Sequence, residues 1–199
     1  MKPSYKGFEA KKRVGYLTLP PVGAYEAEIQ EVRFVKADGE KYFRDTIELM
    51  IEITDGEYKN RYHEVYKSQD ERFGNASYKG VFRLYPPTDN DEDWRRSVFE
   101  SNLWAVEDSD PSFHWDWDEK KLKGKKVGIS VRKYLYTYNG ENKETTEIGQ
   151  LESLKEIKAG KVNPMKPRDK RKNKDDEEST NGSEFTDVSK DSDIEVPWP

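Results

Sequence analysis

Four side chains on one predicted strand have the types and spacing to bind flat, negatively charged ligands. Arg132, Tyr134, Tyr136 and Tyr138 alternate in the sequence, so they share one face of a strand that precedes a turn at 139–140. Aromatic rings on a rigid strand stack on any nucleobase, at about 1–3 kcal/mol per base, and cationic neighbours attract the phosphates. The same tyrosines would also suit a barrel wall, because tyrosine favours strands. Three tyrosines in phase with an arginine favour a single-stranded nucleic acid as the ligand.

Strands must hold these residues, and the hydrophobic pattern predicts three strands in the first third of the chain. Residues 23–35 alternate in apolar character and change phase after Ile29, which indicates a bulged strand. Residues 47–53 alternate most regularly, and Asp-Gly at 55–56 predicts a hairpin turn. Residues 61–67 are rich in tyrosine and valine and are predicted as the third strand.

The second half of the body predicts a helix and two more strands. Residues 91–107 have helical apolar spacing and an acidic first turn. The strand at 127–138 returns through Asn-Gly at 139–140 to a fifth strand that runs toward 154. We therefore predict a mainly β fold. It is a five-stranded OB-like (oligonucleotide-binding) Greek-key barrel with one α-helix inserted between strands 3 and 4 and a disordered C-terminal tail.

A second group of aromatic and basic residues would lie around the groove of such a barrel. Its candidate members are Lys41, Tyr42 and Arg44 in a loop, and Arg61, Tyr62, Tyr66 and Lys67 in the third strand. Glu48 and Glu52 lie on the polar side of the second strand and would repel a phosphate chain. We therefore predict that the groove lies over the third and fourth strands. The alternative is that this group is only a solvated polar face.

Charge is strongly segregated along the chain. The 199 residues carry a net charge of −5, but residues 175–199 hold nine acids and one base, so the preceding residues carry +3. Residues 158–174 hold eight bases and one acid, and the chain beyond 158 has too few apolar residues to order itself. We predict an OB-like single-stranded DNA-binding domain at 1–160, a basic linker at 161–174 and a disordered acidic tail at 175–199.

The end of the acidic tail has apolar side chains that a purely solvated tail does not need. Its predicted partner-binding residues are Asp191, Asp193, Ile194, Val196, Pro197 and Trp198. Such a motif can insert an aromatic ring into a partner's pocket while the acids meet its basic rim. The alternative is a featureless tail with incidental apolar residues.

An aromatic and basic OB-like body, a basic linker and an acidic tail that ends in Asp-Ile-Glu-Val-Pro-Trp-Pro resemble single-stranded DNA-binding proteins, particularly those of bacteriophages of Gram-positive hosts. The resemblance implies protection of exposed strands during DNA replication or recombination. It also implies that the tail recruits replication or recombination proteins. The family's last aromatic residue carries the terminal carboxylate, whereas Pro199 follows Trp198 here.

The sequence offers little for catalysis. It has no cysteine and only His63 and His114 as histidines, so thiolate catalysis and cysteine-based zinc sites are excluded. Residues 55–59 carry the two acids and the lysine of metal-dependent nucleases, but Asp-Gly is also a common hairpin turn. We expect a protein that is not an enzyme, with no metal and no cofactor. With no apolar run near 18 residues and no secretory signal, we expect no membrane partner and a cytoplasmic location, the host cytoplasm if phage-encoded.

Three alternatives stay open. The barrel could bind protein, as an adaptor or a virion-associated interaction module that binds no nucleic acid. Stacking and charge do not distinguish DNA from RNA, so an RNA ligand fits the same residues. Edge strands of OB barrels can also pair between copies, which makes a homo-oligomer possible.

Overall fold

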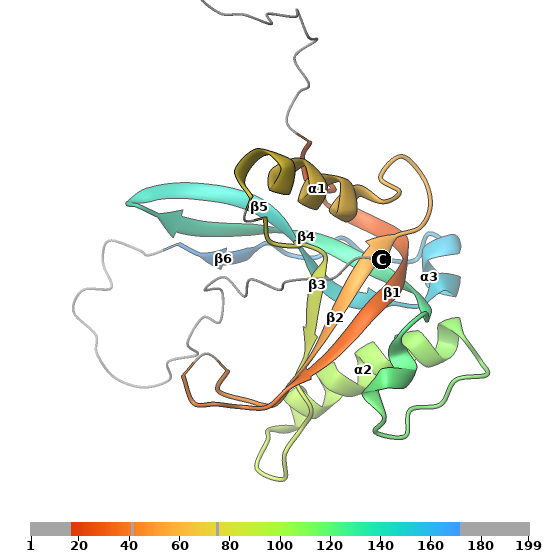
Figure 1. The fold of residues 1–199 in the computed structure, drawn as a ribbon. Coiled ribbons are helices and arrows are strands. Elements are labelled where there is room, and N and C mark those ends of the chain that lie inside the picture. The colour runs from red at the N-terminus through yellow and green to blue at the C-terminus, as the bar shows by residue number, and fades with distance from the viewer. Residues whose placement is uncertain (1–16, 41, 75, 172–199) are drawn as a thin grey trace, which may run out of the picture.

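The computed structural model describes residues 17–171 apart from 41 and 75, and these residues form an open six-stranded sheet with helices packed on it (Figure 1). The strands are β1 (Gly23–Val35), β2 (Thr46–Ile53), β3 (Val81–Leu84), β4 (Lys126–Tyr138), β5 (Glu141–Glu152) and β6 (Arg168–Lys170). The helices are α1 (Arg61–Phe73), α2 (Asp93–Ser109) and α3 (Leu154–Lys158), with a short 3-10 helix η1 (Glu119–Leu122). No helix in this part of the chain is long and apolar enough to cross a membrane.

The sheet has the strand order β3-β2-β1-β4-β5, and all of these neighbours are antiparallel. The short strand β6 pairs with β4 in parallel, beyond the stretch of β4 that pairs with β1. β3 and β5 lie close to each other, but no hydrogen-bonded ladder joins them in the described residues. The sheet therefore curls without closing. The predicted mainly β fold is confirmed, while a closed barrel is not observed.

Several predicted elements are present at the predicted positions. The β1–β2 register shifts between Ile29 and Glu31, which matches the change of phase in the sequence. β2, α2 and β4 also lie where the apolar spacing placed them. Asn139 and Gly140 join β4 to β5 with φ angles of 50° and 77°, as the left-handed positions of a tight hairpin turn require.

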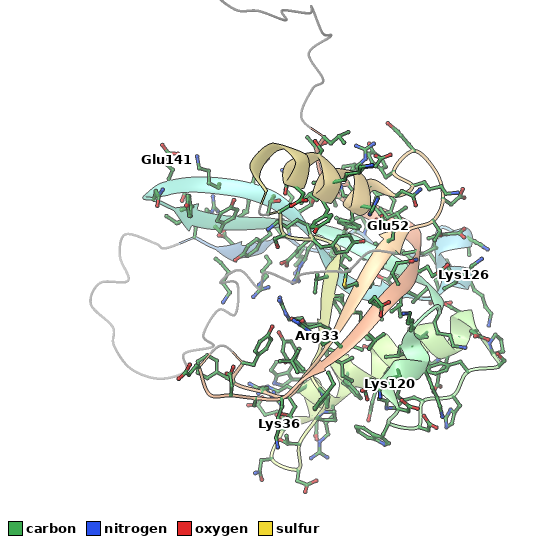
Figure 2. All side chains as sticks on the ribbon, viewed as in Figure 1. Arg33, Lys36, Glu52, Lys120, Lys126 and Glu141 are labelled. Atoms are coloured by element: carbon green, nitrogen blue, oxygen red, sulfur yellow. The ribbon has the colours of Figure 1, made fainter. Side chains whose placement is uncertain are left out.

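The prediction of a third strand at 61–67 is wrong, because these residues begin helix α1. Tyr62 and Val65 are buried, and Tyr66 packs beside them, at the i, i+3 and i+4 spacing of one helix face. Glu52 accepts the backbone N–H groups of Tyr62 and His63 at 3.2 and 2.7 Å, so a carboxylate from β2 caps the start of the helix (Figure 2). A cap supplied by a distant strand has no local sequence signal.

Strand β2 is buried on both faces. Its apolar residues belong to the same hydrophobic core as Phe99 and Val106 of α2. On the other face Glu48 and Glu52 are only 1% and 5% exposed. Burial raises the pKa of Glu52, and the backbone N–H donors that it accepts only partly offset this effect. The acidic side of β2 is therefore an internal polar layer.

The basic segment after α3 is not wholly disordered, contrary to expectation. Its residues through 171 run back along the sheet, and β6 lies beside the β4–β5 hairpin (Figure 1). Met165 fits against Gly149 of β5, where a Cβ atom would meet the Met165 sulfur at 2.3 Å. The missing side chain of Gly149 lets Met165 lie directly against β5, and a larger residue would have to displace the Met165 side chain.

Candidate nucleic-acid interface

A groove of about 680 Å³ lies between β3 and β5, where the sheet does not close. Arg44, Arg83, Arg95, Arg132 and Arg168 line it, and Glu147 is the one acid among its described lining residues. We name this site the arginine groove. Its arginines come from five separate segments between residues 44 and 168, so only the folded chain brings them together.

Aromatic side chains stand at the same groove with much of their surface free. Phe43 and Trp94 are each 53% exposed, and Tyr85 is 41% exposed. Large apolar side chains at a cationic groove are suited to stack on flat ligands, because every base has a π-face. The arginine groove therefore combines phosphate-binding charge with exposed rings.

The β4–β5 hairpin continues this surface through Arg132 and Arg168. The rings of Tyr134 and Tyr136 stack with centroids 5.4 Å apart and planes 13° apart. The guanidinium of Arg168 lies 5.4 Å from the Tyr134 ring centroid. Neither ring belongs to the buried core, and Tyr138 is 62% exposed. The predicted aromatic face therefore lies outside the core.

Carboxylates hold the arginines of the groove in place. Glu147 contacts Arg132 at 2.8 Å and Arg168 at 3.5 Å. Arg83 contacts Glu48 at 2.9 Å, and Arg33 of β1 contacts the same carboxylate at 2.5 Å. Register places these last three residues side by side on β1, β2 and β3.

The third carboxylate, Asp91, lies just before α2. It accepts Arg44 in a short ion pair and Arg95 at 3.5 Å. The backbone N–H of Thr88, together with Arg44, lowers the Asp91 pKa to about 2. The carboxylate is therefore ionised at neutral pH.

Glu48 also stays ionised, for a different balance of reasons. Burial by itself raises its pKa, but hydrogen bonds and charge from Arg33 and Arg83 outweigh burial and hold the pKa below its ordinary value. Tyr42 donates a further hydrogen bond to Glu48 at 3.1 Å.

Two predicted DNA-binding tyrosines are corrected by the structure. Tyr42 is 6% exposed and Tyr62 is 2% exposed, so neither ring can stack on a base. Tyr42 is directed inward to reach the buried Glu48, and Tyr62 faces the sheet from α1. Aromatic side chains occur both in hydrophobic cores and on binding surfaces, and the sequence alone could not show that these two rings face inward.

The other predicted residues are divided between two regions. Arg44 and Arg132 line the arginine groove, and Tyr134, Tyr136 and Tyr138 follow Arg132 along β4 toward the hairpin turn. Arg61, Tyr66 and Lys67 belong to α1 and do not line it. Lys41 lies outside the described residues, as do the tail residues Asp191, Asp193, Ile194, Val196, Pro197 and Trp198.

Sequence reasoning missed several members of the groove, chiefly Arg83, Tyr85, Trp94, Arg95 and Arg168. The segment 82–85 alternates apolar with arginine and tyrosine residues, which is a strand signal too short to stand alone. Arg168 appeared only as one base of a presumed linker.

The described residues contain no group of three or more histidine, aspartate or glutamate side chains that could hold a metal ion. Comparison of the chain with protein-family models and with curated proteins returns no match.

Proposed function

We propose that this protein binds single-stranded DNA, with little preference for sequence, in the arginine groove and along the β4–β5 hairpin. The observation that carries the proposal is the lining of the groove, which has five arginines and one carboxylate beside exposed aromatic rings. Arginine supplies phosphate contacts and the rings supply base stacking, which are the two elements of sequence-tolerant single-strand binding. In this proposal the protein acts by occupancy, protecting exposed strands in replication or recombination, and it performs no catalysis.

The stacking surfaces differ in how open they are. Tyr134 already contacts Arg168 and Tyr136, so we assign it a structural role, in which it holds these two side chains in place. Tyr136 and Tyr138 lie farther out on the hairpin and are the rings on which a base would stack. In the groove that role falls to Tyr85 and Trp94.

The strand order is consistent with an OB-like fold, which would support the proposed function. Five antiparallel neighbours in the order β3-β2-β1-β4-β5, with β3 approaching β5, suit a partly open five-stranded barrel. Helix α2 follows the third strand, where the helix was expected. In this interpretation α1 is an insertion between the second and third strands.

The test is a titration of fluorescent oligo-dT by anisotropy at about 50 and about 200 mM salt, beside a duplex of equal length. Each phosphate contact on a single strand contributes about −0.7 to the slope of log affinity against log salt, so three or more contacts predict at least a roughly 15-fold loss. The double variant Arg83→Ala/Arg168→Ala should bind more weakly and with a shallower slope. The matched control is Lys120→Ala, because Lys120 is exposed beside α2 and does not line the groove (Figure 2).

An affinity that does not change with salt, or that equals the affinity for duplex, would contradict the proposal. Absence of oligo-dT binding would contradict it too and would favour the adaptor alternative. An oligo-U titration in the same series decides between DNA and RNA. Recruitment of replication or recombination proteins by the acidic tail is a separate part of the proposal. It is tested by pull-down with and without residues 175–199.

A further inference from the structure

Five arginines that line the groove, together with Arg33 of β1, share three carboxylates, two arginines to each acid. Glu48 lies between Arg33 and Arg83, Asp91 between Arg44 and Arg95, and Glu147 between Arg132 and Arg168. We name these sets the Glu48, Asp91 and Glu147 triads. Each carries two positive charges and one negative charge. The same count recurs in three triads that share no residue.

In two of the three triads the acid is more deeply buried than its arginines. The side chain of Glu48 is 1% exposed, while those of its arginines are 50% and 24% exposed. The Asp91 side chain is 6% exposed, against 24% and 30% for its arginines. In the Glu147 triad all three side chains are part-buried. A ligand in the groove would therefore meet mainly guanidinium groups.

Tyr85 lines the same groove as one arginine from each triad. Its pKa is raised by burial, and Arg83, Arg168 and Arg44 act to lower it. These three arginines come one from each triad, so all three triads lie within electrostatic range of the Tyr85 hydroxyl. Five of the six triad arginines also line the same groove, the exception being Arg33.

We propose that each triad is a seat for one phosphate group, so that three phosphates of a single strand cross the arginine groove around Tyr85. Glu48, Asp91 and Glu147 then act as positioning residues. This inference rests on the proposed function, which it deepens by stating how many phosphates the groove takes and how they are held.

The physical reason is that two neighbouring guanidinium groups repel each other and lose side-chain entropy when they are aligned. A carboxylate fixed between them offsets the repulsion and orders both side chains before the ligand binds. A guanidinium has five N–H donors in a planar fork, which is more than one carboxylate can accept. The net charge of +1 per triad matches the single negative charge of one phosphodiester.

The decisive variant is Glu147→Gln, because Glu147 is only part-buried and its change leaves the core intact. Simple charge counting predicts tighter DNA binding, since the groove loses a negative charge. The triad proposal predicts the opposite: oligo-dT binding about tenfold weaker and a salt slope shallower by about 0.7, because one seat is lost. The matched control is Glu144→Gln on the same strand, whose side chain is 67% exposed and pairs with Lys133 outside the groove. It should bind as tightly as wild type or slightly more tightly.

Two further variants ensure that the conclusion does not depend on whether Glu147→Gln folds normally. Asp91→Asn removes the charge of a second triad and should give the same loss. Arg132→Lys keeps the charge and lacks the planar fork, so it should also weaken binding, whereas Arg96→Lys on α2, away from the groove lining, should not. Thermal melts establish that each protein is folded.

The outcomes separate the two levels of the proposal. If wild type does not bind oligo-dT, the proposed function fails. If wild type binds and Glu147→Gln or Asp91→Asn binds more tightly with an unchanged slope, the function stands and the triad inference is overturned. Equal affinity of Arg132→Lys and wild type would also overturn it, because charge alone would then explain the groove.

Discussion

Replacing Tyr136 with alanine separates binding from folding most cleanly. Its ring stacks on Tyr134 at 5.4 Å on the hairpin and lies outside the hydrophobic core. Loss of one aromatic pair removes about 0.5–1.5 kcal/mol of stability. In a domain of this size that corresponds to a fall of about 1–6 °C in Tm. The fold should therefore survive.

The expected loss of binding is larger than the loss of stability. If one base stacks on Tyr136, its removal costs about 1–3 kcal/mol of binding free energy, which is about 5- to 160-fold in Kd. Tyr136→Phe keeps the π-face and should bind as wild type does. Tyr136→Leu keeps apolar surface without a ring and should bind as weakly as the alanine variant.

Anisotropy with a short oligo-dT at one fixed salt concentration measures this series. Trp104→Ala is the control, because Trp104 is 51% exposed on α2 and does not line the arginine groove. Equal affinities of Tyr136→Leu and Tyr136→Phe would refute stacking at this position. Wild-type affinity of Tyr136→Ala would remove the hairpin from the binding surface.

Three further predictions concern the buried residues and the tail. Tyr62→Phe should unfold at a urea concentration equal to or higher than that of wild type, because the buried Tyr62 hydroxyl has no hydrogen-bond partner in the described structure. Tyr62→Ala should lower the free energy of unfolding by about 3–5 kcal/mol, because it leaves a cavity in the core. The pKa of Glu48 in the folded state is below its ordinary value, so its ionised form stabilises the fold above the ordinary glutamate pKa. This stabilisation is lost as the pH falls through the folded-state pKa. The urea midpoints of wild type and Glu48→Gln should therefore differ at neutral pH and converge in acid. Truncation after Lys174 removes a net charge of −8 that can compete with DNA for the basic body, so it should tighten oligo-dT binding. Unchanged or weaker affinity of the truncated protein would show that the tail does not compete with DNA.

Local sequence determined much of the secondary structure. The regular alternation at 47–53, the change of phase after Ile29 and the Asn139-Gly140 turn each predicted an observed element, because strand period and turn chemistry depend on neighbouring residues. The helical spacing of α2 was equally local. The same reasoning failed at 61–67, where tyrosine and valine favour a strand but Glu52 and the sheet surface select a helix.

The direction of each side chain was decided by the tertiary structure. Tyr42 and Tyr136 have the same chemistry, yet one reaches inward to Glu48 and the other stacks on the exposed hairpin. Glu48 and Glu52 were expected to repel a nucleic acid, but both are buried, and buried polar groups need partners. Glu48 pairs with two arginines, and Glu52 accepts the backbone N–H groups at the start of α1. Sequence composition identified the aromatic and basic character of the surface. The arginine groove itself exists only because the curl of the sheet brings Arg44, Arg83 and Arg168 together, and no pattern within a short window encodes that convergence.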